Sequence, residues 1–262
     1  MKFSNLFTTK KPVIACIHLM PLPGSPLYEG NMESVIKTAL AETEIFKRQG
    51  IEGLIVENFR DMPFYPGSLP AATVAAMASV TREIVKSFPG PVGINALRND
   101  AVAALSIAVA TGAKFIRVNV HTGAAVTDQG LIQGKAHETL RLRESLKSEV
   151  LIFADVNVKH ATPLGNRRIE LETRDLTERG LADAIIVSGD RTGAAANVMD
   201  IDKVRQNTHL PLILGSGATP DNLAIFLPKT DSMIVGSYFK KDGNAANRVE
   251  EKRVKEFMNK LH

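Results

Sequence analysis

The sequence contains little of what defines several large classes of protein. Among its 262 residues there is one cysteine, Cys16, and there is no tryptophan. A single cysteine excludes an internal disulfide framework and a cysteine-rich zinc site, and it is compatible with a reducing compartment. No apolar run approaches the roughly 18–20 residues that a membrane-spanning helix needs. We therefore expect neither a disulfide-stapled protein nor an integral membrane protein.

The chain also has little excess of charge of either sign. It has 32 Lys and Arg residues against 28 Asp and Glu residues, a net charge of +4. The basic residues are scattered, and the densest group, near the C-terminus, is interleaved with glutamates. Aromatic residues make up only 5% of the chain, so platforms for stacking bases are few. A nucleic-acid partner is therefore not predicted.

The N-terminal residues resemble a secretory signal only in part. Lys10 and Lys11 precede an apolar stretch, but His18 and several prolines interrupt that stretch. We interpret it as a first β-strand, and we expect a cytoplasmic protein.

Short apolar runs alternate with longer amphipathic segments along the chain. Runs rich in Val, Ile and Leu are typical of parallel strands that helices cover. The expected strands are residues 13–18, 53–57, 91–95, 115–120, 150–156, 184–187, 212–214 and 232–235. The expected helices are residues 33–49, 69–88, 100–111, 136–147, 170–179, 200–206 and 221–227, with a last helix near 246–261.

This alternation predicts the fold class. About eight strand–helix units at a spacing of roughly thirty residues indicate a (β/α)8 TIM barrel. Because no composition break interrupts the pattern, we expect a single domain over residues 1–262. A doubly wound open sheet is the competing architecture.

Polar side chains end several of the expected strands. His18 ends the first, Glu57 the second and Asn95 the third. Reactive groups of such barrels lie at the C-terminal ends of the strands. Two later strands each carry three polar residues at alternate positions, so the three side chains of a strand should point to the same face. The first set is Arg117, Asn119 and His121, and the second is Asp155, Asn157 and Lys159. We expect these residues to converge on one cavity, with structural ion pairs such as Glu57 or Asp155 with Arg117 as the alternative.

Glycine-rich segments follow the last two expected strands. Residues 215–219 read Gly-Ser-Gly-Ala-Thr, and Gly236 and Ser237 follow the eighth strand. These loops are the usual phosphate cradle of the barrel, because glycines let the backbone approach an anion closely. Tight turns alone are the alternative. The polar loop at 188–193 is a candidate cover for the site.

Several of these blocks resemble the signature blocks of the BtpA/SgcQ family. The resemblance spans residues from about Pro12 to Phe257 and rests on residues 18–26, 56–59, 93–100, 115–123, 154–161 and 215–219. It implies a barrel of the ribulose-phosphate-binding type. It also implies two biological settings. One branch of the family is linked to photosystem I biogenesis as a peripheral membrane-associated factor, and another belongs to a bacterial sugar-utilisation gene cluster.

The candidate residues divide into two sets. The catalytic candidates are Glu57, His121, Asp155, Lys159 and His18. The substrate-binding candidates are Asn95, Arg117, Asn119, Asn157, Gly215, Ser216, Gly217, Gly236 and Ser237. Lys159 fits either a Schiff-base lysine or a cation that binds phosphate or carboxylate. No cofactor is predicted. A divalent metal on Glu57, Asp155, His18 and His121 is a minor alternative, because no compact ligand motif is present.

Two functions follow from these features. The first is an isomerase, epimerase, aldolase or lyase acting on a phosphorylated sugar-like metabolite by proton transfer or carbon–carbon bond chemistry. The second is a non-catalytic assembly factor that docks a partner, a membrane surface or a second copy of the chain. The second function is suggested by apolar residues in loops, because an exposed apolar cluster can dock a partner. These residues are Leu19, Met20, Leu22, Phe59, Met62, Phe64 and Tyr65. We interpret residues 121–135 as a lid or an interface loop.

Overall fold

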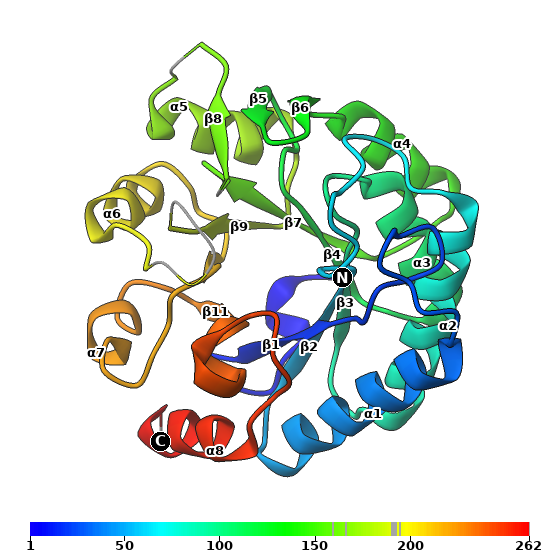
Figure 1. Ribbon diagram of the computed structural model, residues 1–262. Helices are drawn as coiled ribbons and strands as arrows, with labels where there is room; N and C mark the ends of the chain where they lie inside the picture. Colours follow the sequence, from blue (N-terminus) through cyan, green and yellow to red (C-terminus); the bar gives the residue numbers. More distant parts are fainter. Residues whose placement is uncertain (159, 166, 190–192, 194, 262) are drawn as a thin grey trace.

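Eight parallel strands close into a barrel in the computed structural model (Figure 1). The structure describes residues 1–158, 160–165, 167–189, 193 and 195–261. The barrel closes because the first strand pairs with the second strand on one side and with the last strand on the other. In the pairing of the first and last strands, Val13 lies opposite Met233. The expected TIM barrel is confirmed, and the open sheet is excluded. The strands are β1 (Val13–His18), β2 (Gly53–Glu57), β3 (Val92–Asn95), β4 (Phe115–Val118), β7 (Leu151–Val156), β9 (Ala184–Val187), β10 (Leu212–Leu214) and β11 (Ser232–Val235).

Helices surround the barrel, as Figure 1 shows. They are α1 (Met32–Arg48), α2 (Ala71–Ser87), α3 (Ala101–Thr111), α4 (Ala136–Ser145), α5 (Ile169–Arg174) with its π-helical continuation η2 (Asp175–Arg179), α6 (Val198–Gln206), α7 (Leu223–Phe226) and α8 (Glu251–Leu261). The described part of the chain also contains the short 3₁₀ helices η1 (Phe3–Asn5), η3 (Ser237–Phe239) and η4 (Lys241–Gly243). The helix expected at 221–227 is shorter than predicted, and the last helix begins at Glu251 rather than near 246. Among the described residues, no helix has the length and apolar character needed to cross a membrane.

Local capping explains where one of the covering helices begins and ends. The Asp100 carboxylate accepts a hydrogen bond from the Ala103 amide at 2.9 Å and so satisfies an amide of the first turn of α3. Gly112 ends the helix at a φ of 88°, a conformation that glycine adopts without steric conflict. Most of α3 is apolar and buried, since it lies against both the barrel and the neighbouring helices.

Two buried apolar clusters of the described residues belong to the barrel and its helices. One lies between the strands and the helices, and the other fills the inside of the barrel. Inside the barrel, the rings of Phe115 and Phe153 stack at 4.5 Å. A Cβ built on Gly93 would lie 2.0 Å from the Phe115 ring, so only glycine leaves room for this ring. Phe3 and Phe7 pack against the same cluster from the N-terminal segment, which lies over the centre of the barrel in Figure 1.

A small antiparallel sheet replaces much of the loop expected at 121–135. Its strands are β5 (Ala124–Thr127), β6 (Gly130–Gln133) and β8 (Ala161–Pro163), in the order β6-β5-β8. Val120, Ala125, Ile132 and Val158 form a separate buried cluster beneath it. The sheet therefore has its own apolar support, and it joins the segments that follow β4 and β7.

Candidate active site

A cavity of about 720 Å³ opens at the C-terminal ends of the strands. Most of the residues proposed from the sequence line it. These are His18, Glu57, Asn95, Arg117, Asn119, Gly215, Ser216, Gly217, Gly236 and Ser237. Asp155, His121 and Asn157 do not line this cavity, and Lys159 lies outside the described residues. Residues 190–192 of the proposed covering loop are likewise not described.

Glu57, at the end of β2, contacts side chains from three other strands. Its Oε1 accepts a hydrogen bond from Asn95 Nδ2 at 2.9 Å and lies 3.8 Å from Arg117 Nη1. Its Oε2 lies 3.6 Å from His18 Nε2. The side chain is buried, so its negative charge is compensated by these partners rather than by bulk water. One carboxylate oxygen thus faces the amide and the guanidinium, and the other faces the imidazole.

Asp155 lies behind the cavity wall and holds Arg117 there. Arg117 donates from Nε and Nη2 to the two carboxylate oxygens, both at 2.8 Å. Asp155 also accepts from Asn119 Nδ2 at 2.9 Å and from Ser188 Oγ at 3.2 Å. Burial alone lowers the pKa of the Arg117 guanidinium, but Asp155 and Glu57 outweigh it and raise the pKa above its ordinary value. Arg117 therefore stays cationic, and the alternative of a structural ion pair describes Asp155 well.

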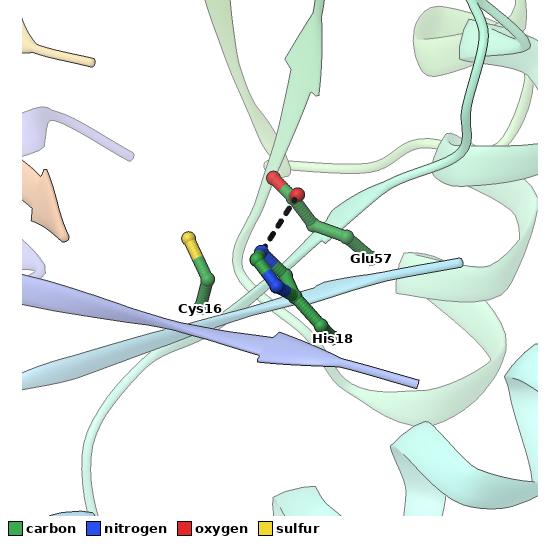
Figure 2. Close-up of side chains that lie close together, drawn as sticks. All are labelled: Cys16, His18 and Glu57. Atoms are coloured by element: carbon green, nitrogen blue, oxygen red, sulfur yellow. Dashed lines mark ion pairs between the residues drawn. The ribbon is translucent and has the colours of Figure 1, made fainter. Parts of the chain in front are cut away.

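His18 is held in one orientation by two further contacts. Its Nδ1 lies 3.0 Å from the carbonyl oxygen of Ala245, which can only accept, so Nδ1 carries the hydrogen. The ring stacks on Phe59 with centroids 4.2 Å apart. Nε2 consequently points toward Glu57, as Figure 2 shows.

His121 lies away from the other candidates. The expected alternation through Arg117 and Asn119 ends because β4 stops at Val118, two residues earlier than predicted. His121 Nε2 donates to the carbonyl of Gly180 at 2.9 Å, and burial lowers the pKa of the imidazole. Asn157 adopts a positive φ of 50° after β7 and is exposed. Parity therefore becomes less reliable beyond the end of a strand, since Asn119, one residue past β4, still lines the cavity and His121 does not.

The glycine segments form a second part of the cavity wall. A Cβ on Gly215 would lie 2.3 Å from Ser188 Oγ, so the chain passes this point only with glycine. Gly217 has a φ of 76°, which again favours glycine. Ser216 is buried, and its Oγ accepts from the Gly189 amide at 3.3 Å. The main chain after β10 and β11 thus lies directly against the cavity.

Several lining residues were not among the sequence candidates. Cys16 is one of them, although it lies two positions before His18 on β1 and therefore shares its face. Arg98 is another. It follows β3, is buried, and donates to Asn119 Oδ1 at 3.4 Å. Burial lowers the pKa of Arg98, and the charge of Asp155 partly offsets this effect. Arg253 reaches the cavity from α8, with its guanidinium 4.4 Å from the centre of the Tyr238 ring.

The residues expected for the metal alternative do not come together as proposed. Asp155 is occupied by Arg117, and His121 faces Gly180. Among the described residues, a different set of possible ligands is assembled. One donor atom each of Cys16, His18 and Glu57 lies within 4.8 Å of the others, and all three residues are buried (Figure 2).

The fold is shared with solved barrels of low sequence identity. N-(5'-phosphoribosyl)anthranilate isomerase from Pyrococcus furiosus superposes with a TM-score of 0.58, covering 95% of this chain and 98% of that chain at 15% identity. A likeness at this identity shows the fold alone.

Comparison of sequences identifies the family. The BtpA family model matches residues 9–262. A photosystem I biogenesis protein, BtpA, from Synechocystis is 44% identical over 98% of this chain and 90% of its own length. An uncharacterized protein from Thermococcus kodakarensis is 45% identical over 95% of this chain and 94% of its own length. With these matches spanning nearly its whole length, the chain belongs to the BtpA family.

Proposed function

We propose that the chain binds a phosphorylated sugar-like metabolite at the C-terminal rim and acts on it by proton transfer or carbon–carbon bond chemistry. The observation that carries the proposal is the cavity of about 720 Å³ between two unlike walls. The glycine wall offers main-chain approach to a phosphate, and the polar wall offers a carboxylate, an imidazole and amides. A cavity of this size is in the range of small-molecule sites.

The geometry assigns a different role to each wall. Gly215, Ser216, Gly217, Gly236 and Ser237 contact the phosphate in this proposal. On the polar wall, Glu57 and His18 move the proton, because both line the cavity and lie 3.6 Å apart. Asn95, Arg117 and Asn119 orient the polar groups of the substrate. Asp155 positions Arg117 and Asn119 from behind the wall.

Binding is tested by calorimetry and thermal shift with a panel of sugar phosphates and their unphosphorylated counterparts. The phosphorylated member of a pair should bind more tightly. Ser237→Asp, which places a negative charge at the glycine wall, should weaken that binding at least about tenfold through like-charge repulsion. Ser106→Asp on the exposed face of α3 is the matched control and should leave binding unchanged. Equal binding of both members of every pair would contradict the proposal.

The chemistry is tested with the sugar phosphate that binds most tightly. Proton transfer at a carbon exchanges that hydrogen with solvent, so NMR in D₂O should show its loss in the presence of the protein. Glu57→Gln keeps the shape and the hydrogen-bonding oxygen but removes the base. It should slow exchange by about 10²–10⁴-fold while the phosphate still binds. Exchange at the wild-type rate would remove Glu57 from this role.

A second function, a non-catalytic assembly factor, is supported by the Synechocystis relative, whose name refers to photosystem I biogenesis. Part of the apolar loop set is not available for docking, because Leu19 and Leu22 are buried and Phe59 stacks on His18. Met62 and Tyr65 remain 47% and 46% exposed and are the candidates for contact with a partner, a membrane surface or a second copy of the chain. Replacing both with Ser should reduce pull-down of a partner and any self-association or vesicle binding. Unchanged results would remove the support for docking there.

A further inference from the structure

The side chains of Cys16, His18 and Glu57 meet at the wall of the cavity from two adjacent strands. Cys16 and His18 share the inward face of β1, and Glu57 ends β2 in register with His18. One donor atom of each lies within 4.8 Å of the others, and Figure 2 shows all three pointing toward a common space. Two ligands on one tetrahedral ion at the usual bond lengths of about 2.0–2.3 Å lie about 3.3–3.8 Å apart. The separation of 3.6 Å between His18 Nε2 and Glu57 Oε2 is close to that value.

Two of the three donors are already oriented by other groups. The hydrogen on His18 Nδ1 is directed to the Ala245 carbonyl, so the imidazole in its neutral form presents its lone pair at Nε2. A ligating histidine in metal sites usually has this kind of second hydrogen bond. Asn95 binds Glu57 Oε1, which leaves Oε2 on the side of the imidazole. The arrangement therefore requires little reorganisation to place an ion between them.

Space for an ion exists because residue 236 is glycine. A Cβ at this position would lie 3.3 Å from Cys16 Sγ and 3.5 Å from His18 Nε2. The φ of Gly236 is −111°, which other residues also adopt, so backbone conformation does not require glycine here. Its absent side chain instead leaves the volume beside two of the donors open.

Two cations near the three residues are each paired with a carboxylate of their own. Arg117 and Lys240 both interact electrostatically with Cys16, but each is neutralised by its own carboxylate. Asp155 pairs with Arg117 and Glu42 with Lys240, both at 2.8 Å. Glu57 adds a further negative charge, with Arg117 at the longer distance of 3.8 Å. A divalent ion between the donors is therefore not opposed by an uncompensated positive charge on either of these two residues.

We infer that Cys16, His18 and Glu57 form a site for a divalent transition-metal ion of the zinc class, with a fourth position open to the cavity. A sulfur, an imidazole nitrogen and a carboxylate oxygen are the donor types that Zn²⁺ accepts, and three protein ligands with one open position are typical of catalytic zinc. The site is independent of phosphate binding, but while an ion is bound Glu57 and His18 act as its ligands and do not move the proton. An ion there would bind an oxygen of the molecule in the cavity and stabilise negative charge that develops on it.

The test uses the purified protein, stripped with chelator and titrated with Co²⁺ or Zn²⁺ in phosphate-free buffer. Because Cys16 is the only cysteine, a cobalt–thiolate absorption band reports this residue alone. We expect the band to saturate at one equivalent. Cys16→Ser should abolish the band, and Cys16→Ser, His18→Ala and Glu57→Gln should each weaken zinc binding at least about tenfold. His137→Ala is the matched control, since exposed His137 lies 3.7 Å from Glu138 in a similar pair.

Two results would overturn the inference. One is the absence of a cobalt–thiolate band in the wild-type protein, which would leave only an ion pair between His18 and Glu57. The other is zinc binding by the three variants equal to that of His137→Ala. If the variants do not fold, Gly236→Ala decides, because it retains all ligands and should weaken zinc binding by filling the space. Phosphate binding is measured separately without metal, so failure of one proposal leaves the other intact.

Discussion

The two ends of the barrel interior differ sharply in chemistry, although the same strands supply both. At the N-terminal end the inward side chains are apolar, and Phe3 and Phe7 pack against them. At the C-terminal end the inward residues of β1 to β4 are His18, Glu57, Asn95 and Arg117, and a cavity opens above them. Stability requires only the first kind of end, because buried charges are at best weakly stabilising. The difference is one reason why we propose that the polar end binds a ligand.

The largest expected effect comes from removing the carboxylate behind the polar wall. Asp155→Ala leaves the buried guanidinium of Arg117 with Glu57 at 3.8 Å and Ser188 Oγ at 3.4 Å, and Asn119 Nδ2 loses its acceptor. We expect a loss of roughly 3–5 kcal/mol in the free energy of unfolding, measured by urea denaturation, together with loss of ligand binding. Asp155→Asn, which retains a hydrogen-bond acceptor, should lose less. A stability equal to wild type would show that the network contributes nothing to folding.

A smaller effect is expected at the apolar end. Phe7→Ala removes a partly buried ring that packs against the inner cluster and lies near Gly53. We expect a loss of roughly 1–3 kcal/mol in the free energy of unfolding, below the range for a fully buried ring, with unchanged affinity for any ligand of the cavity. A change in ligand affinity in Phe7→Ala would contradict this expectation, because it would mean that packing at the N-terminal end of the barrel affects binding at the C-terminal end.

The same comparison explains how much could be read from the sequence. The barrel and the inward polar residues at the ends of β1 to β4 follow from alternation, because a strand repeats every two residues. Alternation does not predict the positions of residues that lie beyond the ends of the strands. His121 lies beyond β4, and Arg98 lies in a loop whose conformation no periodicity specifies. The sheet β6-β5-β8 was missed because only Ala125 and Ile132 of its central pair are buried, too few for a clear pattern.

Cys16 illustrates a different failure. Its parity with His18 was visible in the sequence, but a cysteine in a strand is more often a small apolar core residue. What distinguishes it is the neighbouring Gly236, which lies 220 positions later in the chain and leaves the space beside Cys16 Sγ open. Such a contact depends on the closure of the barrel, in which β1 pairs with β11.

The smallest expected effect concerns a third carboxylate at the polar end, Asp61 in the loop after β2. No ion pair of Asp61 is found within the described part of the chain, and it accepts hydrogen bonds from the Leu22 amide at 2.8 Å and from Asn58 at 3.2 Å. Burial raises the pKa of Asp61 from 3.8 to about 6, and these hydrogen bonds offset only part of the effect. The folded state therefore holds the proton more tightly than the unfolded state. The resulting stabilisation is complete below pH 3.8 and is lost as the pH rises through about 6.

This pH dependence gives Asp61→Asn a specific signature. A pKa difference of about 2 corresponds to about 3 kcal/mol, and partial solvation reduces it to roughly 1–2 kcal/mol. Between pH 4 and pH 7, the unfolding free energy of the wild type should fall by that amount relative to Asp61→Asn, measured by urea denaturation at each pH. Parallel pH profiles for the wild type and Asp61→Asn would contradict this prediction. They would show that ionising Asp61 does not lower the free energy of unfolding, and that this end of the barrel tolerates a carboxylate without an ion-pair partner as readily as a paired one.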